Sequence, residues 1–520
     1  MNQQNNILNT QAGDSTPTAN NGTQNNMGIK KAALDFEKKL NNTKWIEAIR
    51  LQIAAQYLYD LLARHGTFID TNAQDEEEVD YHSIYWIDRH GKAMSITSNA
   101  ILLMLSDRYG IHILDSKQRK NTYELFKRIA YIKARKVQTS LTVYWDCSNK
   151  VLYKYAGKGK MYVLDGNTVT EEVNGYNNIY FLGNITPYKY LPNQSQLTLD
   201  SLFEGHFDEA IISRSEASLL LKYWFYSVFF SSELKARPIM HIYGPYRSGK
   251  TTLLKNLHKL IAGYDAKPTT MKQKPDDFYA HVANNDSCLF DNVDGKVSNE
   301  IMDAIAAITS STVYSRRKLF TTNELYKSTI NTSLAFTSQA VNFREDVVDR
   351  SILLKTERIN ETQEMFEVNS TNWNELQSAL LDKLNQLVFS LRQSDSTLQK
   401  TKLRMYDFAN WIYKVNSSDF YSIENIMTKM QKETNDGYSE IAELVASIIH
   451  KRKLSGFILF RELLKYINDE NKAIGISLID STTNMNKKLN TQLDALKQHG
   501  YILKKEKKKE GWGWTIKATE

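Results

Sequence analysis

Residues 244–251 have the sequence Gly-Pro-Tyr-Arg-Ser-Gly-Lys-Thr, which decides the fold class. The stretch follows the apolar run 238–243 and precedes an amphipathic run that begins at Thr252. The pattern G-x-x-x-x-G-K-[ST] between a strand and a helix is that of a phosphate-binding loop (P-loop), in which backbone N–H groups surround an anion. The sequence therefore predicts an α/β domain that binds a nucleoside triphosphate.

The side chains of the loop have separate expected roles. Lys250 would contact the β- and γ-phosphates, and the Thr251 hydroxyl would bind Mg²⁺. ATP and Mg²⁺ are the expected cofactors. The remaining expected nucleotide-binding residues of the loop and the helix start are Gly244, Ser248, Gly249 and Thr252.

Length and composition limit the class of protein. A chain of 520 residues, 42% of them apolar, has room for two to four domains. No apolar run of about eighteen residues occurs, and the N-terminus lacks a signal pattern. The two cysteines, Cys147 and Cys288, are too few for a disulfide framework or a zinc site. We expect a cytoplasmic protein without a membrane partner.

Changes in pattern along the chain predict five segments. The first is rich in Asn, Gln and Thr and cannot bury enough apolar surface to fold. Helices are expected within 30–64 and 98–136, and a β-meander within 141–182, because the apolar spacing changes there to period two. The predicted segments are a disordered tail (1–28), an α+β N-terminal domain (29–200), the ATPase core (201–360), a helical lid or linker (361–437) and a winged-helix domain (438–520).

Positive charge is concentrated near the end of the chain. The formal net charge is +7, and between Lys487 and Lys517 nine lysines occur with only three acidic residues. Such a patch attracts phosphate backbones, although a solvated lysine-rich surface needs no partner. We expect contact with nucleic acid in this region.

A second apolar strand, 287–290, ends at Asp291, about forty residues after Lys250. A carboxylate in this position is the expected Mg²⁺ ligand, whereas capping of a turn is the plainer alternative. Asn292 follows directly, with Asp294 two residues later. The sequence does not decide which of these two residues positions the attacking water.

Polar residues also follow a third strand, 333–336. Thr337, Ser338 and Gln339 offer groups that could contact the γ-phosphate or the attacking water, and ordinary turns have similar residues. Arg350 then precedes a fourth apolar strand. In ring ATPases such an arginine contacts the γ-phosphate bound to the neighbouring subunit, whereas a local salt bridge is the alternative.

An insertion separates the second and third strands. A helix over 297–308 is followed by a predicted β-hairpin over 313–330 that carries basic and aromatic side chains. In channels that hold single-stranded DNA, basic side chains bind the phosphates and aromatic side chains stack on the bases. The alternative is a surface hairpin whose charges are only solvated. The expected DNA-binding residues are Arg316, Arg317, Lys318 and Lys327.

These motifs together resemble those of the AAA+ replicative helicases of mobile elements, which include the superfamily-3 and the phage and plasmid primase-associated helicases, with a looser likeness to MCM proteins. The family commonly has an acidic pair in the second stretch and Asn as the sensor, where this chain has Asn292 and Gln339. The stretches that carry the resemblance are GPYRSGKT (244–251), CLFDNVD (288–294), SRRKLFTTNE to LAFTSQ (315–339) and DVVDRSILL (346–354).

The resemblance implies an AAA+ core and a homo-hexameric ring that hydrolyses ATP between subunits. Such a ring moves along single-stranded DNA, 3′ to 5′, and acts on forked or origin DNA during replication of a phage, plasmid or integrated island. The catalytic residues would be Lys250, Asp291, Asn292 and Arg350. A primase motif is not found in the first 200 residues, so a primase or an initiator would be a separate chain.

Two other classes of function stay open. An origin-binding initiator or loader would use ATP for assembly, and Asn292 leaves room for slow hydrolysis. A nucleotide-switched regulatory or defence ATPase would need no basic channel hairpin. The basic cluster 316–318 therefore argues against this class. Stimulation of ATP hydrolysis by single-stranded DNA separates the helicase from both.

Overall fold

The chain divides into two compact units, each described here by itself. The first contains the described part of Met1–Leu197 with Leu260–Asp265 and Asn369–Phe389, and the second contains the rest. The computed structural model describes residues 21–71, 81–192, 199–295, 297–310, 313–317, 325–330, 332, 333–341, 343–359, 365–394, 398–401, 403, 405–473, 481–482, 485–486, 489 and 493–518.

The first unit begins with helices packed on a small sheet of strand order β3-β2-β1-β4. The helices expected within 30–64 and 98–136 are present. Residues 1–20 of the predicted disordered tail lie outside the described residues, and 21–28 are helical instead because α1 already begins at Asn21. Phe36 and Leu40 anchor this helix, and extending a formed helix costs little per residue. The elements are α1 (Asn21–Leu40), α2 (Glu47–Ala63), β1 (Gly66–Asp70), β2 (Ile84–Asp88), β3 (Ala93–Ser95), α3 (Asn99–Tyr109), α4 (Lys117–Lys133) and β4 (Arg135–Lys136).

A four-stranded antiparallel meander is present within 141–182, as predicted. The apolar run 179–182 at the end of that range is not part of the meander but pairs in parallel with β5, and the meander ends with β9, whose polar sequence Val-Thr-Glu-Glu-Val has no apolar alternation. The elements are β5 (Gln138–Ser140), β6 (Val143–Asp146), β7 (Val151–Gly157), β8 (Lys160–Leu164), β9 (Val169–Val173) and β10 (Ile179–Phe181).

Helix α10 (Trp373–Gln393) lies in the segment predicted as lid or linker, and most of it belongs to the first unit. Its side chains hydrogen-bond the segment after the meander: Ser378 Oγ accepts from Leu191 N at 2.9 Å, and Asn374 Oδ1 from Lys189 N at 3.0 Å. Asn385 Oδ1 likewise accepts from Gly166 N at 2.8 Å. The segment 361–437 is therefore divided between the two units.

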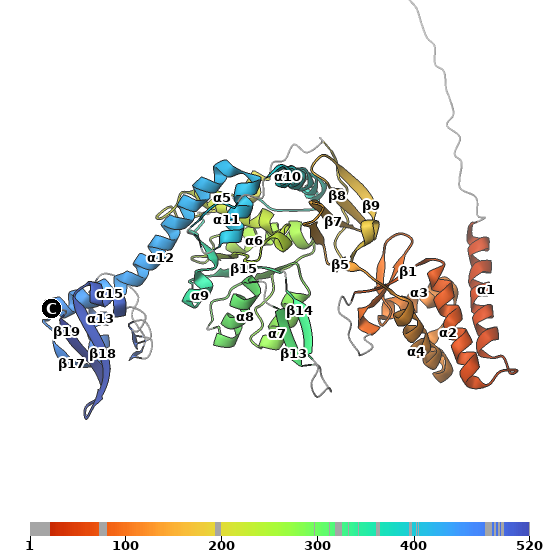
Figure 1. Cartoon of the computed structure of the whole chain (residues 1–520), viewed down its shortest axis with the longest axis horizontal. Coiled ribbons are helices and arrows are strands. Elements are labelled where there is room, and N and C mark those ends of the chain that lie inside the picture. The colour runs from red at the N-terminus through yellow and green to blue at the C-terminus, as the bar shows by residue number, and fades with distance from the viewer. Residues whose placement is uncertain are drawn as a thin grey trace, which may run out of the picture. The chain divides into compact units, whose positions relative to one another are not determined.

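The second unit is built on a parallel sheet of strand order β12-β15-β11-β16. The strands are nearly continuous apolar runs because helices cover both faces, with α6 on one side and α7 and α8 on the other (Figure 1). This confirms the predicted parallel α/β core. The elements are α5 (Arg214–Val228), β11 (Ile239–Tyr243), α6 (Lys250–Ala262), α7 (Pro275–Ala283), β12 (Ser287–Phe290), α8 (Asn299–Thr309), β15 (Ser333–Ser338), α9 (Glu345–Val348) and β16 (Ser351–Lys355).

The predicted hairpin is present between α8 and β15. Its antiparallel strands are β13 (Val313–Arg317) and β14 (Leu325–Thr329), and the turn between them lies outside the described residues. Short 3₁₀ helices occur at Tyr81–Ser83, Ile113–Asp115, Tyr176–Asn178, Asp200–Leu202 and Ser231–Glu233.

The C-terminal part of the chain forms a small domain after a long helix. A three-stranded sheet of order β17-β19-β18 packs on helices around the buried residues Leu463, Leu503 and Trp514. The last two strands of the chain, β18 and β19, form an antiparallel hairpin. No helix in the described ranges is long and apolar enough to cross a membrane. The elements are α11 (Tyr406–Val415), α12 (Ser417–Lys451), β17 (Gly456–Leu459), α13 (Phe460–Ala473), α15 (Leu493–Gln498), β18 (Tyr501–Lys508) and β19 (Gly511–Ala518).

Candidate nucleotide site and inserted hairpin

The loop 244–249 connects the end of β11 to the start of α6. Its glycines are required by the backbone, since φ is +149° at Gly244 and +77° at Gly249. A Cβ on Gly244 would overlap the Thr356 carbonyl, and Ser248 Oγ lies 2.8 Å from Thr356 Oγ1. The loop is thereby fixed against the end of β16.

Lys250 is buried inside this loop. Its Nζ donates to Gly244 O at 2.9 Å, to Pro245 O at 2.7 Å and to Ser248 Oγ at 3.2 Å. Burial lowers the pKa of Lys250, while the nearby carboxylates of Asp294 and Asp291 act in the opposite direction. The ammonium group is therefore held where phosphate oxygens could replace the loop carbonyls.

Asp291 joins three elements at the edge of the sheet next to the loop. Its Oδ1 accepts a hydrogen bond from Thr251 Oγ1 at 2.8 Å and another from Thr337 Oγ1. Thr337 Oγ1 also accepts from Asn292 N at 3.0 Å. A hydroxyl and a carboxylate are the hard oxygen donors that Mg²⁺ prefers, so this pair fits a Mg²⁺ site that phosphate and water would complete.

The sequence indicated Thr337 only as one of several polar residues after a strand. In the structure its hydroxyl hydrogen-bonds Asp291. Ser338, the expected nucleotide-binding residue, is 1% exposed and has its Oγ 2.7 Å from His241 Nε2. Its hydroxyl also contacts Ala340 O at 2.7 Å. Because neighbouring residues of a strand point to opposite faces, Thr337 contacts the site and Ser338 contacts β11.

Gln339, Asn292 and Asp294 surround the open side of the site. Gln339 Nε2 donates to Tyr246 Oη at 2.7 Å and to Asp294 Oδ2 at 3.2 Å. Exposed Asn292 has a positive φ of 55°, and its Nδ2 lies 3.3 Å from Asp291 Oδ2. Three polar side chains are thus available near the position of a γ-phosphate.

Arg350 lies at the opposite end of the sheet from the loop. Ile239, the first residue of β11, pairs with Ser351, and Arg350 O accepts from Ile239 N at 2.9 Å. The length of β11 thus separates Arg350 from the loop, which is roughly 15 Å at about 3.3 Å per residue. Arg350 cannot contact a nucleotide bound to its own P-loop.

The neighbouring Arg344 is more strongly paired than Arg350. Arg344 Nη2 donates to Asp303 Oδ1 at 2.6 Å and to Asp346 Oδ2 at 2.8 Å, and these carboxylates raise its pKa. Arg350 Nη1 donates to Asp346 O at 2.9 Å and lies 3.8 Å from its carboxylate. Arg358, after the end of β16, is exposed. Arg350 therefore keeps a weaker local ion pair than Arg344.

Three of the expected DNA-binding residues lie on the inserted hairpin. The register pairs Arg316 with Tyr326, Arg317 with Leu325, and Lys327 with Ser315. Lys318 lies outside the described residues. The three positions therefore share one two-stranded element.

Both ends of this insertion are fixed by one buried arginine. Arg237 Nη2 donates to Ile308 O at the end of α8 and to Ile330 O after β14, each at 2.8 Å. Its backbone N donates to Thr309 O at 2.9 Å. Burial lowers the pKa of Arg237 to about 10. Arg237 lies two residues before β11, the strand that ends in the P-loop, so it connects the hairpin to that strand.

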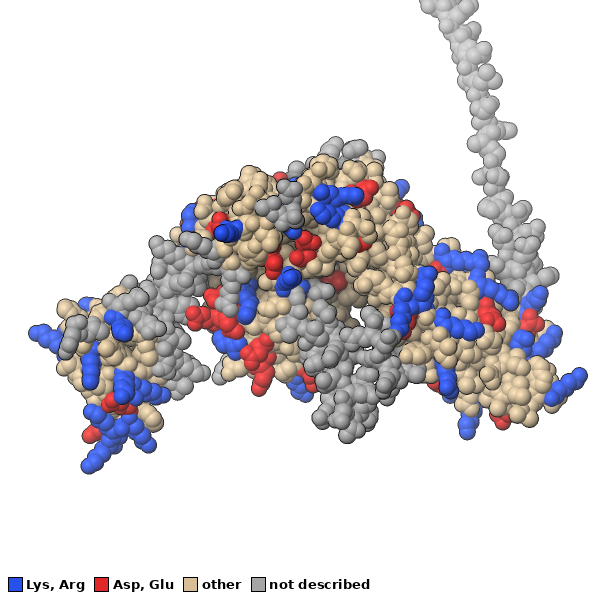
Figure 2. Space-filling model, in the orientation of Figure 1, with Lys and Arg blue, Asp and Glu red and all other residues tan. Residues whose placement is uncertain are grey.

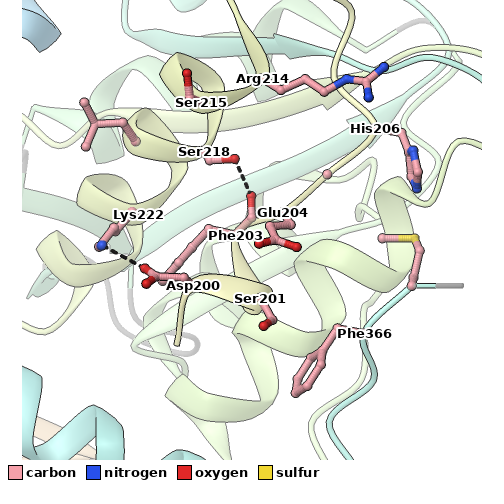
Figure 3. Close-up of a pocket in the computed structure, with 13 residues that line it drawn as sticks. Asp200, Ser201, Phe203, Glu204, His206, Arg214, Ser215, Ser218, Lys222 and Phe366 are labelled. Carbon is pink, nitrogen blue, oxygen red and sulfur yellow. Dashed lines mark hydrogen bonds and ion pairs between the residues drawn. The ribbon is translucent and has the colours of Figure 1, made fainter. Parts of the chain in front are cut away.

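A pocket of about 750 Å³ is lined by α5, by the segment before it, and by Met365 and Phe366 (Figure 3). Its wall continues into the loop region, because His206 O accepts from Glu357 N at 2.7 Å and Met365 lies where a Cβ on Gly249 would be. Within the wall, Lys222 Nζ pairs with Asp200 Oδ1 at 3.0 Å. The lining residues are Asp200, Ser201, Phe203, Glu204, Gly205, His206, Arg214, Ser215, Ser218, Leu219, Lys222, Met365 and Phe366.

Comparison with known proteins gives one family match. Residues 213–430 match the family described as the actinomycete integrative conjugative element replication protein, and this range contains the loop, Asp291, the hairpin and Arg350. No curated protein matches the chain.

The solved structures that are similar differ widely in coverage. An apo structure of the NrS-1 C-terminal region is similar over 90% of this chain and 99% of its own, at 10% identity and a TM-score of 0.39. A second apo form has 11% identity and a TM-score of 0.37 over 89% and 98% of the chains. A JCV helicase structure covers 45% of this chain and 67% of its own, at 10% identity and a TM-score of 0.22.

Proposed function

We propose that this chain is an ATP-hydrolysing DNA helicase in the replication of an integrative conjugative element or a related mobile element. The family match over 213–430 supports the role in replication. The hydrogen bond between Thr251 and Asp291, at 2.8 Å, carries the proposal of ATP hydrolysis. It joins the two side chains that P-loop ATPases use to hold Mg²⁺.

In this proposal the residues of the loop bind the triphosphate. Lys250 exchanges the carbonyl oxygens of Gly244 and Pro245 for phosphate oxygens, so its ammonium needs no long movement. Thr251 and Asp291 hold Mg²⁺, with Thr337 orienting the carboxylate. When bound, Mg²⁺ neutralises charge on the phosphates.

The pocket beside the loop takes the base and ribose. Its half-buried Phe366 offers a stacking surface, and Glu204, Asp200 and Ser201 offer acceptors for amino and hydroxyl groups. Its volume of about 750 Å³ is ample for a nucleoside. The triphosphate would then extend from the pocket over Gly249.

The attacking water is positioned by the polar group at the end of β15. Gln339 is oriented by Tyr246 and Asp294, so its amide has a defined direction before the nucleotide binds. Asn292 adds a second amide and Asp294 supplies the nearby carboxylate. This arrangement compensates for the absence of a glutamate directly after Asp291.

Arg350 completes the site of a neighbouring subunit. Its separation from the loop of its own chain by the length of β11 supports a role in trans, and a closed ring of six identical chains satisfies every such contact. The homo-hexamer is therefore part of the proposal.

The hairpin binds single-stranded DNA and responds to the nucleotide. Arg316, Arg317 and Lys327 give β13 and β14 positive charge for phosphates. Arg237 links the ends of the insertion to β11, whose other end is the P-loop. A change at the loop can thus reach the hairpin through one strand.

A replication initiator or loader that uses ATP mainly for assembly is the second candidate. The observation that favours it is Asn292, because the residue directly after Asp291 is not acidic. Slow hydrolysis with strong binding of specific duplex DNA would support this candidate.

Steady-state ATP hydrolysis with and without single-stranded DNA tests the proposal, together with strand displacement on forks that have a 3′ or a 5′ tail. We expect stimulated turnover and unwinding that depends on the 3′ tail. If single-stranded DNA does not change the rate of ATP turnover and no strand is unwound, the helicase assignment is overturned. That result would favour the initiator or a nucleotide switch.

A further inference from the structure

Trp512 and Trp514 lie on the same face of β19 but differ in exposure. Trp514 is 1% exposed, and its Nε1 donates to Asn486 Oδ1 at 2.8 Å in the core of the C-terminal domain. Trp512, two residues earlier, is 51% exposed. Because alternate residues of a strand share a face, Trp512 extends the core face of the hairpin into solvent.

Two lysines flank the exposed indole. Lys507 is the cross-strand partner of Trp512, and its Nζ lies 5.8 Å from the ring centroid. Lys505 lies diagonally across, 5.3 Å from the same centroid and 5.6 Å from the Phe460 ring. The three residues form one surface, which we call the Trp512 platform.

The surroundings of the Trp512 platform are positively charged. The hairpin over 501–518 contains six lysines and two glutamates, a net charge of +4. Glu506 is already bonded to Thr515 Oγ1 at 2.7 Å. Figure 2 shows lysine side chains gathered at the end of the β18–β19 hairpin. Anions are therefore attracted to the place where the indole is exposed.

We propose that the Trp512 platform binds single-stranded DNA, with an unpaired base stacked on the indole and the adjacent phosphates on Lys505 and Lys507. Both ammonium groups are carried on flexible chains, so either can leave the ring for a phosphate when a base takes its place. This assigns the C-terminal hairpin to unpaired strands, a second DNA contact besides the inserted hairpin.

The combination of groups favours a nucleic acid strand over a protein partner. An apolar protein surface that covered Trp512 would also have to remove Lys505 and Lys507 from water, which costs free energy without anionic partners. A single strand supplies an aromatic face and a negative charge at every nucleotide, and stacking on tryptophan tolerates any base. A duplex hides its base faces and would use only the lysines.

The test compares variants of the full chain without nucleotide, so that neither hydrolysis nor ring movement is required. Trp512→Ala should weaken binding of a labelled oligo(dT) about tenfold, and Trp512→Phe should restore most of the affinity. Ile502→Ala is the matched control, because it removes another exposed apolar side chain, 43% exposed, from the opposite face of the hairpin. Its affinity should not change.

Two further readouts locate the contact. Oligo(dT) should quench tryptophan fluorescence of the wild-type chain more than that of Trp512→Phe. Lys505→Gln with Lys507→Gln should reduce the slope of log affinity against log salt by about 1.4, at about 0.7 for each phosphate contact on a single strand.

Equal quenching in the wild type and Trp512→Phe, or unchanged affinity of Trp512→Ala, would overturn the proposal. So would an effect seen only with blunt duplex, or only on self-association in sedimentation. The proposal shares its DNA substrate with the proposed helicase, but none of these readouts needs ATP. The results can therefore disprove DNA binding by the Trp512 platform without affecting the proposal of ATP-dependent unwinding. A failure of unwinding would likewise leave the platform proposal untouched.

Discussion

Thr251 at the start of α6 and Asp291 at the end of β12 are hydrogen-bonded at 2.8 Å, although forty residues separate them in the chain. The parallel sheet makes this contact, since the carboxyl ends of its strands share one edge. Thr337 adds a second hydrogen bond to the same carboxylate oxygen.

Lys250→Ala should abolish ATP hydrolysis, with turnover reduced at least about a hundredfold, because the loop loses the charge that stabilises the phosphates. Steady-state phosphate release measures it. Lys255→Ala, an exposed lysine one turn further along α6, is the control and should keep wild-type turnover. Full activity of Lys250→Ala would mean that the loop is not the hydrolytic site.

Thr337→Val should lower ATP turnover about 10- to 100-fold, as loss of a group that orients a metal ligand does. The volume of the side chain is nearly conserved, so the fold should persist, and a circular dichroism melt checks this. Ser338→Ala is the matched comparison, because this hydroxyl contacts His241 and should affect stability more than turnover. Equal losses of turnover in both variants would contradict the assignment of Thr337.

The parallel core was predictable because the residues of each strand and of the loop carry the signal within a few neighbouring positions. Strands such as Ile239–Tyr243 and Ser287–Phe290 are nearly continuous apolar runs, and the glycines of the loop mark the turn from β11 to α6. By contrast, β9 and β5 have polar sequences, and they become strands only through pairing, β9 with the neighbouring β8 and β5 with the distant β10. Local periodicity does not contain that information.

The same distinction applies to the site. The spacing of Lys250 and Asp291 indicated a phosphate and metal site, whereas the choice between Thr337 and Ser338 depends on which face of β15 meets β12. That face is set by strand order, which a single sequence does not give. Period two could have shown only that one of the two residues, and not both, faces the loop.

Arg350→Ala should leave ATP binding nearly unchanged and reduce turnover by about 10³-fold or more, because Arg350 stabilises charge in the neighbouring site. Mixing it with Asp291→Ala should restore part of the activity, since mixed rings contain some intact interfaces. Nucleotide binding and phosphate release measure the two effects. No recovery in the mixture, with mixed rings demonstrated, would count against the role in trans.

Lower pH should destabilise the fold through two buried histidines. Burial lowers the pKa of His241 and of His258 to about 4, whereas an unfolded histidine has a pKa of about 6.5. Below pH 6.5 the unfolded state therefore binds protons that the folded state does not. Each histidine should lower the free energy of unfolding by about 2 kcal/mol at about pH 5 relative to neutral pH.

Urea unfolding of the wild type and of His241→Gln across this range measures the effect. The glutamine keeps a hydrogen-bonding side chain toward Ser338 and cannot titrate. Its loss of stability with falling pH should be smaller by about 2 kcal/mol. The same pH dependence in both proteins would show that His241 takes up its proton while folded.

Arg237→Lys should uncouple ATP hydrolysis from DNA. Lysine keeps the charge but cannot donate to Ile308 O and Ile330 O from one planar group, so the ends of the hairpin insertion are no longer tied to β11. We expect basal turnover within about threefold of wild type and loss of its stimulation by single-stranded DNA, with stability lowered by about 1–3 kcal/mol. Ile305→Val, a buried change in α8 that costs about 1 kcal/mol and leaves both carbonyls bonded, controls for the lost stability. Equal loss of stimulation in this control would assign the effect to general loosening of the core, whereas loss in Arg237→Lys alone identifies the arginine as the connection between the nucleotide and the hairpin.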